Sequence, residues 1–202
     1  MKKIARRVID RRILALTFDD GPNPELTPKI LDLLKSYGAK ATFFIVGKNA
    51  RMYPEIVERI RSEGHDIGCH SHQHLNAWKT VPWRAVADIN AGYQTLSPWL
   101  SADGIFRPPH GKMTLPTYLA IRRRGAKVWW WTLDSGDTHD KLPSPLAVQH
   151  VVAGRQGAIV LLHDLHTQNH PEQRDRFVLE ISAALLELAR RESLIVAPLG
   201  QI

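Results

Sequence analysis

Cysteine is almost absent from this chain of 202 residues, which contains Cys69 and no other. A single cysteine excludes an intramolecular disulfide, and the scarcity is typical of a reducing compartment. We interpret Cys69 as a small buried side chain and not as a metal ligand, because on a strand it points away from the face that its neighbour His70 occupies.

Long hydrophobic runs are absent as well, because no stretch approaches the roughly 18–20 apolar residues of a membrane-spanning helix. The basic start is similar to the first part of a signal peptide, but the apolar run that follows extends only over 13–16. We therefore expect either a cytoplasmic protein or an exported domain whose signal was removed before this numbering begins.

Compositional bias is also lacking. Hydrophobic residues make up 44% of the chain and charged residues 23%, as in an ordinary folded domain. This composition excludes disordered, collagen-like and low-complexity classes. The length predicts one domain, or at most a small second one, that can form its own core without a metal ion or a disulfide.

The net charge is unevenly distributed. The formal charge is +7, of which +5 lies in residues 1–12. We predict a basic N-terminal arm over 1–11 and a single domain over 12–202. The nearly neutral body argues against a nucleic-acid partner. We interpret the arm as a solvated segment, with contact to an anionic membrane or cell-wall surface as the alternative.

Short strand-like runs alternate with helix-like runs along the whole chain. This alternation predicts βα units around a parallel sheet, and about seven repeats in one domain favour an α/β fold of the distorted (β/α) barrel type with about seven parallel strands. Strands are expected at 12–17, 41–46, 65–69, 105–107, 126–132, 158–163 and 194–197, and helices at 27–37, 54–63, 82–100, 115–124, 144–152 and 174–191. Thr27 is expected to cap the first helix.

Ionisable residues follow five of the expected strands. Because catalytic groups of such barrels gather at the carboxyl ends of the strands, we expect these residues to meet at one site. Each one alone is more typical of a capped turn or of a buried histidine. They occur in the segments Asp19-Asp20, His70 to His74, Arg107 to Gly111, Asp134 to Asp137, and Leu161 to Asp164.

His70 and His74 are four residues apart. On a helical turn this spacing places both rings on one face, where they can bind one cation. A carboxylate from another strand end would complete a set of two histidines and one carboxylate. Such a set is typical of zinc or a similar divalent ion with positions left for water.

The ordered segments resemble the polysaccharide deacetylase family, the NodB homology domain of carbohydrate esterases. The resemblance covers about residues 12–197. Five segments match the motifs of the family in order: Thr17-Phe18-Asp19-Asp20-Gly21-Pro22, His70-Ser71-x-x-His74, Arg107-Pro108-Pro109-His110-Gly111, Asp134-x-x-Asp137 and Leu161-x-His163. His110 stands where the third motif usually has an aromatic residue, and Thr138 stands where the fourth usually has tryptophan. These departures make a standard chitin-like substrate less expected.

The resemblance implies a metal ion and a general base. Asp20, His70 and His74 would hold a divalent metal, zinc in the first place, with cobalt or nickel as alternatives. Asp19 would be the general base, kept ionised by the nearby cation and by Arg107.

The resemblance also implies a general acid and a substrate pocket. His163 would be the acid, and Asp137 would stabilise its imidazolium form and pair with Arg107. The backbone N–H of His110 would hold the oxyanion. Leu161 would line the pocket for the acetyl methyl group, and Pro109 and Gly111 are further substrate-binding candidates.

The activity implied by the resemblance is that of a metal-dependent hydrolase, which removes N-acetyl groups from an amino sugar or polysaccharide. An O-acetyl esterase and a deformylase acting on a lipid-linked sugar are alternatives, and the basic arm would suit a membrane-surface substrate. A non-catalytic carbohydrate-binding relative is a further alternative, against which the proton-transfer groups argue.

Residues outside the motifs receive weaker interpretations. Trp78 and Trp83 are candidates for a platform that stacks on a sugar, whereas at least two residues of the run 129–131 are expected in the core. His166 and His170 are candidates for the lining of a substrate or product path.

Overall fold

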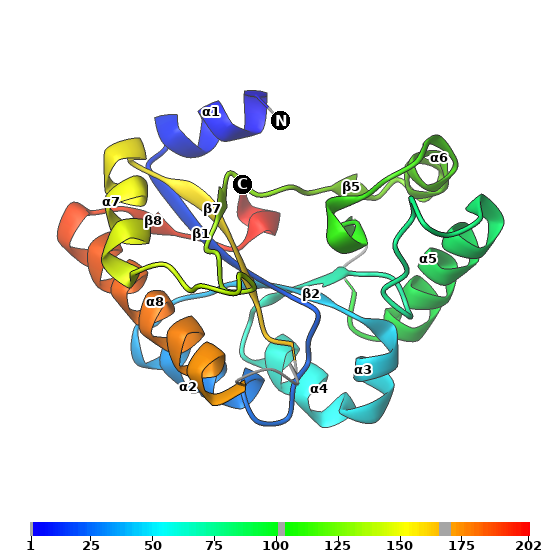
Figure 1. Ribbon diagram of the computed structural model, residues 1–202, viewed down its shortest axis with the longest axis horizontal. Helices are drawn as coiled ribbons and strands as arrows, with labels where there is room; N and C mark the ends of the chain where they lie inside the picture. Colours follow the sequence, from blue (N-terminus) through cyan, green and yellow to red (C-terminus); the bar gives the residue numbers. More distant parts are fainter. Residues whose placement is uncertain (1, 101–103, 166–170) are drawn as a thin grey trace.

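The structure is a computed structural model that describes residues 2–100, 104–165 and 171–202. Its centre is one curled sheet of parallel strands with helices on the outside (Figure 1). The strands are β1 (Ile13–Asp19), β2 (Thr42–Ile45), β3 (Asp66–Cys69), β4 (Ile105–Phe106), β5 (Lys127–Val128), β6 (Leu133–Asp134), β7 (Ala158–His163) and β8 (Ile195–Val196). This architecture confirms the predicted distorted (β/α) barrel.

The sheet has the strand order β5-β4-β3-β2-β1-β7-β6, and β8 pairs with β1. The register aligns Ile13 with Ile195 near the start of β1, while Asp19 at its end aligns with Phe44 of β2 and His163 of β7. The end of β1 therefore lies at the centre of the sheet, between β2 and β7, which run beside it in Figure 1.

The barrel is open between β5 and β6, which do not pair among the described residues. The single strand predicted over 126–132 is wrong, because the chain leaves β5 and crosses this gap before it enters β6. The crossing segment is hydrogen-bonded to β4 at its start and to β7 at its end: the N–H of Trp129 donates to the carbonyl of Phe106, and the N–H of Thr132 donates to that of Ile159. The three tryptophans thus lie at the open seam.

Alternation along β1 decides which of its side chains enter the barrel. Ile13 and Ala15 belong to the interior apolar cluster, whereas Leu14, Leu16 and Phe18 belong to the cluster beneath the helices. Successive side chains of a strand point to opposite faces, so Asp19 follows Ala15 at two steps of two residues and also points inward. The strand therefore delivers a carboxylate to the interior at its carboxyl end.

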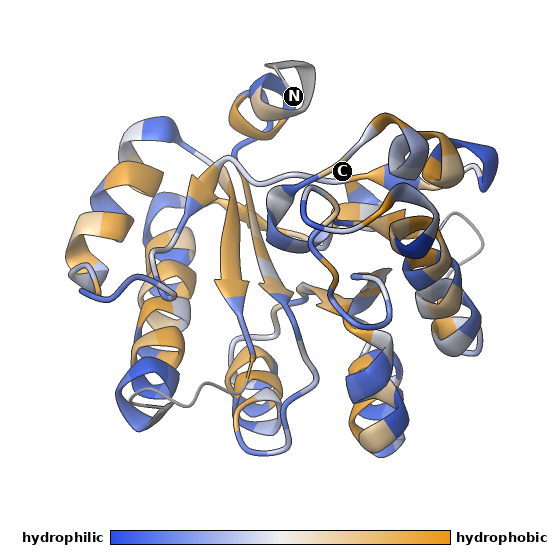
Figure 2. Ribbon diagram, turned by 45° about the vertical axis from the view of Figure 1, so that its right-hand side comes forward, coloured by the Kyte–Doolittle hydropathy of each residue, from blue (hydrophilic) through white to orange (hydrophobic). Residues whose placement is uncertain are grey.

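The outer layer consists of helices with an apolar side toward the sheet, as the colouring of Figure 2 shows. They are α1 (Lys2–Asp10), α2 (Thr27–Ser36), α3 (Gly47–Met52), α4 (Pro54–Ser62), α5 (Pro82–Leu96), α6 (Leu115–Arg123), α7 (Pro145–Arg155) and α8 (Pro171–Glu192), with short 3-10 turns η1 (Pro109–Gly111) and η2 (Leu199–Gln201). Helices α1 and α3 were not predicted. No helix of the described residues is both long and apolar enough to cross a bilayer.

The prediction that Thr27 caps α2 is wrong. The side chain of Asn23 accepts hydrogen bonds from the N–H groups of Glu25 and Leu26 at 2.7 and 2.9 Å, ahead of the helix. The hydroxyl of Thr27 instead donates to the carboxylate of Asp164 at 2.6 Å. Thr27 therefore connects the loop after β1 to the end of β7.

Helix α1 covers the end of the barrel where the strands begin (Figures 1 and 2). Its Val8 is fully buried and packs in the interior cluster with Ile13 and Ala15. Arg6 and Arg7 are exposed on the same helix. The basic charge of the N-terminus therefore lies on the face opposite the carboxyl ends of the strands.

Candidate metal centre and active site

The side chains of the candidate site enter the barrel from the carboxyl ends of neighbouring strands. Asp19 ends β1, His163 ends β7 directly beside it, and His70 and Arg107 follow β3 and β4. The parallel strands end on the same side of the sheet, so the fold brings these four groups together as the sequence pattern predicted.

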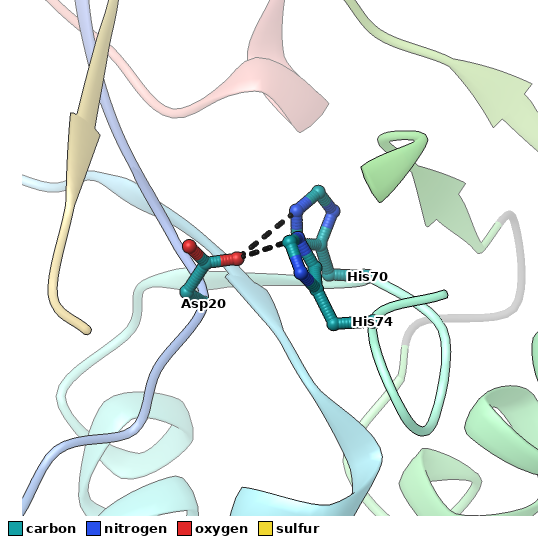
Figure 3. Close-up of side chains that lie close together, drawn as sticks. All are labelled: Asp20, His70 and His74. Atoms are coloured by element: carbon teal, nitrogen blue, oxygen red, sulfur yellow. Dashed lines mark ion pairs between the residues drawn. The ribbon is translucent and has the colours of Figure 1, made fainter. Parts of the chain in front are cut away.

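Asp20, His70 and His74 converge on one point (Figure 3). The Oδ1 atom of Asp20 lies 3.3 Å from Nε2 of His70 and 2.9 Å from Nε2 of His74. Their three ligand atoms all lie within 4.8 Å of one another. The predicted ligand residues therefore lie where a single ion could contact all three.

This donor set fits a divalent metal ion. Oδ1 of Asp20 is buried and, apart from its close contacts with the two imidazoles, has no hydrogen-bond partner among the described residues, so a cation bound there would compensate its burial. Nδ1 of His70 lies 2.7 Å from the carbonyl oxygen of Arg107, a contact that directs Nε2 toward Asp20. Burial alone would raise the pKa of Asp20, but the two histidines hold it well below its usual range.

The segment between the two histidines is a loop, not the predicted helical turn. Ser71 and His74 have positive φ angles of 64° and 58°, and the hydroxyl of Ser71 accepts the N–H of His74 at 3.1 Å. The two histidines meet because the loop folds back on itself. The prediction that they lie together is confirmed, whereas the helical turn expected between them is wrong.

Asp88 of α5 holds this loop from behind and was missed in the sequence. Its buried carboxylate accepts the N–H groups of Gln73 and Leu75, which flank His74, at 2.7 and 3.3 Å. Its backbone carbonyl accepts the N–H of His72. The available signal was an acidic residue among apolar ones on the inner face of the predicted helix.

The carboxylate of Asp19 is held by Arg107. Nη1 of Arg107 donates to Oδ1 of Asp19 at 2.7 Å and to the hydroxyl of Thr17 at 2.7 Å, and its guanidinium lies 4.1 Å above the ring centre of Phe44. Burial lowers the pKa of Arg107, and the charge of Asp19 opposes that shift. The other oxygen of Asp19 lies 3.7 Å from Nε2 of His70, next to the metal ligands.

His163 and Asp137 form a second pair. Nδ1 of His163 lies 2.8 Å from Oδ1 of Asp137, and the N–H of His163 donates to Oδ2 of Asp137 at 2.7 Å. Burial lowers the pKa of His163, but the hydrogen bond and charge of Asp137 outweigh it, together with the charges of Asp19 and Asp20, and raise this pKa to about 9. The protonated form of the ring is therefore favoured at neutral pH.

The predicted contact between Asp137 and Arg107 is wrong, because Arg107 binds Asp19 and Thr17 instead. The arginine beside Asp137 is Arg174 of α8, whose Nη2 lies 3.4 Å from Oδ2 of Asp137. Arg174 was missed because nothing in the local sequence distinguishes it from the other arginines of this helix.

Asp164 contacts the loop after β1 through Gly21 and Thr27. It is buried, and its carboxylate lies so close to Gly21 that a Cβ atom there would come within 2.1 Å of Oδ2. Only glycine lets the backbone approach this closely. Burial raises the pKa of Asp164 to about 7, against the hydrogen bond from Thr27.

The residues of the third motif form the turn η1. His110 has a φ of 55°, its side chain is exposed, and its ring centre lies 4.4 Å from that of His74. Pro109 is buried, and Gly111 faces the ring of Trp131. Leu161 is buried on β7, two residues before His163. The roles predicted for these four residues in substrate and oxyanion binding stay predictions.

A groove with a volume of about 270 Å³ opens over two of the candidate ligands, Asp20 and His74. It is lined by Asp20, Val46, Lys48, Asn49, His74 and Leu165. The side-chain amide of Asn49 donates to the backbone carbonyl of Asp20 at 2.7 Å and so fixes this wall. The groove gives a substrate direct access to Asp20 and His74.

Backbone conformations of positive φ concentrate at this site. Of seven non-glycine residues with positive φ among those described, four are Asp20, Ser71, His74 and His110. Such conformations cost energy and persist where the surrounding structure imposes them, which is common at functional sites.

Trp78 and Trp83 lie at the surface as predicted, but the expectation of at least two core residues in the run 129–131 is wrong, because Trp130 and Trp131 are only partly buried. Trp78 and Trp83 are 66% and 72% exposed, whereas Trp129 is buried. Trp78 is also oriented, because its indole N–H donates to the carbonyl of Met113. His166 and His170 lie outside the described residues.

Comparison with known proteins confirms the resemblance to the polysaccharide deacetylase family. The family model described as polysaccharide deacetylase matches residues 7–139. A peptidoglycan-N-acetylglucosamine deacetylase of Bacillus cereus is 37% identical over 158 residues, which make up 77% of this chain and 74% of that protein. The peptidoglycan-N-acetylmuramic acid deacetylase PdaC of Bacillus subtilis is 31% identical over 166 residues, 78% of this chain and 33% of its own length.

Among solved structures, the Bc1960 peptidoglycan N-acetylglucosamine deacetylase superposes with a TM-score of 0.81 at 29% identity. The superposition covers 96% of this chain and 88% of that one. It extends beyond the segment matched by the family model, which ends before His163.

Proposed function

The chain belongs to the polysaccharide deacetylase family, and from this premise we propose that it is a metal-dependent hydrolase that removes N-acetyl groups from an amino sugar of a polysaccharide. One observation carries the proposal. The ligand set Asp20, His70 and His74 shares a site with two proton-transfer groups, Asp19 and His163, each held by a buried partner.

We propose zinc as the ion held by Asp20, His70 and His74, because two imidazoles and one carboxylate with an open position are typical of catalytic zinc. Cobalt and nickel are alternatives with similar ligand preferences. When bound, a divalent cation supplies a Lewis acid and lowers the pKa of a water molecule held beside it.

Asp19 is the proposed general base. Its carboxylate adjoins the metal ligands through the 3.7 Å contact with His70, while Arg107 binds its other oxygen. This arrangement leaves one oxygen free to accept a proton from the attacking water, while the guanidinium holds the other oxygen in place.

His163 is the proposed general acid. An amine is a poor leaving group unless it is protonated, and the imidazolium form of His163 is stabilised by Asp137 through Nδ1. Nε2 of His163 then carries the proton that the departing nitrogen requires. The backbone N–H of His110 is the proposed donor to the oxyanion that forms during attack.

We propose a glycan of the peptidoglycan type as the first substrate to examine. The relatives named above act on N-acetylglucosamine or N-acetylmuramic acid of peptidoglycan. The basic helix α1 lies at the end of the barrel where the strands begin, opposite the end that carries the candidate site. Contact of α1 with an anionic surface would therefore turn the groove away from that surface, so substrate must reach the site from the other side.

The test is acetate release by the zinc-loaded protein across a substrate panel. The panel contains peptidoglycan fragments, N-acetylglucosamine oligomers, acetylated xylan and small N-acetyl sugars. We expect release from N-acetylated glycans and little from acetylated xylan. Release from xylan alone would replace the amidase with an O-acetyl esterase, and absence of release from every substrate would contradict the proposal.

A further inference from the structure

Arg174 is a nearly buried arginine in the first turn of α8, with 5% of its surface exposed. Its Nη2 donates to the carbonyl of His163 at 2.8 Å and to Oδ2 of Asp137 at 3.4 Å. Its Nη1 donates to the carbonyl of Leu165 at 3.0 Å. The guanidinium therefore hydrogen-bonds to both residues of the pair His163 and Asp137 and to the chain that follows β7.

The carboxylate of Asp137 is shared between two cations. Oδ1 faces the ring of His163, while Oδ2 accepts the backbone N–H of His163 and the guanidinium of Arg174. A buried carboxylate with one cationic partner would bind that cation with its full charge. With two partners, its attraction for the proton of His163 is divided.

The other charged groups near this pair come from β1, its following loop and α8. Asp19 at the end of β1 and Asp20 directly after it act on His163, and Asp164 adjoins His163 in the chain. Asp175 lies 3.8 Å from Nη1 of Arg174. Four carboxylates besides Asp137 thus surround the pair, and Arg174 is the cation that lies against Asp137 itself.

We propose that Arg174 is a positioning residue for the acid step, which shares the charge of Asp137 with His163 and so limits how tightly His163 holds the proton that it gives to the leaving amine. The inference rests on the proposed function and adds to it a group from α8, outside the five motifs and the segment matched by the family model.

A general acid must bind its proton at the working pH and still release it in the reaction. The strength of proton transfer therefore depends on a pKa that is neither too low nor too high. Asp137 raises the pKa of His163, and a neighbouring guanidinium opposes that effect. Asp137 would stay in place without Arg174, because the N–H of His163 still donates to it.

The experiment compares Arg174→Met, which removes the charge, with Arg174→Lys, which keeps it. Arg176→Met is the matched control, because Arg176 lies two residues along the same helix and pairs with Glu180 at the surface. The pH dependence of kcat with an N-acetylated glycan is one readout. The titration of the His163 ring, followed by NMR in the zinc-free protein, is the other.

For Arg174→Met we expect the alkaline limb of kcat and the NMR titration to move upward by about 1 pH unit, and kcat at neutral pH to fall roughly tenfold. Arg174→Lys should keep both within about 0.3 unit of the unmodified protein, and Arg176→Met should change neither. If Arg174→Met does not fold, Arg174→Gln replaces it, since the amide still donates a hydrogen bond without carrying charge.

An unchanged titration in the neutral variants, with or without a loss of kcat, would show a purely structural role and overturn the inference. A downward shift would overturn it too. If the unmodified protein releases no acetate, the proposed function fails, while the NMR titration still decides the inference about Arg174.

Discussion

Asp19 and Asp20 are adjacent in the chain, yet their carboxylates have separate partners. The carboxylate of Asp19 continues the inward alternation of β1 and reaches Arg107 at 2.7 Å. A φ of 77° at Asp20 turns the next carboxylate toward His74 at 2.9 Å. Strand geometry and one left-handed residue thus give two neighbouring carboxylates different chemistry.

The Asp19→Asn variant separates these two roles. It preserves the shape of the side chain but removes the charge that accepts a proton, so we expect kcat to fall by about 10²–10⁴-fold. Metal content should stay unchanged, because Asp20, His70 and His74 are intact. Near-normal turnover in this variant would contradict the assignment of the base.

Removal of a proposed ligand should abolish metal binding. In Asp20→Ala, His70→Ala or His74→Ala, elemental analysis after dialysis should find little zinc. Zinc at about 100 times its dissociation constant should raise the Tm of the unmodified protein by about 5–10 °C and leave that of these variants in place. An equal rise in all four proteins would place the binding site elsewhere.

Asp88 should control metal affinity without touching the metal. Its carboxylate accepts the N–H groups on both sides of His74, and Asp88→Asn replaces one acceptor with a donor. We expect zinc affinity, measured by competition with a chelator, to fall by about 10–100-fold. Asp32→Asn is the matched control, because Asp32 is an exposed helical aspartate paired with Arg59. Equal affinities in the two variants would refute the role of Asp88.

The pH dependence follows from the pKa of His163, which is raised from 6.5 to about 9. The acid form is present below this value and is lost above it, so activity should fall on the alkaline side. A bound cation repels the imidazolium, and this limb should therefore lie at or below about pH 9 in the zinc-loaded enzyme.

Asp137→Asn removes the charge that raises this pKa, so the limb should move toward 6.5. The same sign applies to stability in the zinc-free protein: the contribution of His163 is fully present below pH 6.5 and is lost as pH rises through about 9. If Asp137→Asn left the pH of the alkaline limb of activity unchanged, His163 would be excluded as the general acid.

Much of this site was predictable because strand ends are local signals. Apolar runs that end in Asp19 or His163 indicate both the strand and the end of the sheet where its polar groups gather. The same kind of local pattern gave a wrong prediction for the segment 126–132. Its apolar residues are typical of one continuous strand, whereas the chain crosses the open seam of the barrel there.

The remaining groups depend on tertiary packing. Asp88 reaches the loop that carries His70 and His74 only because α5 packs behind this loop. Arg174 reaches Asp137 only because α8 lies against the end of β7. Neither residue is near its partner in the chain, and Arg174 occupies a helix rich in other charged residues. Side-chain pairs of this kind are fixed by how helices pack on a sheet, which periodicity does not encode.

The most direct test measures bound zinc and acetate release on the same samples of the unmodified protein and of Asp19→Asn, with an N-acetylated peptidoglycan fragment as substrate. The account predicts equal, stoichiometric zinc in both proteins and acetate release from the unmodified protein alone. Equal release from both proteins, or release by the unmodified protein after its zinc has been removed, would contradict it.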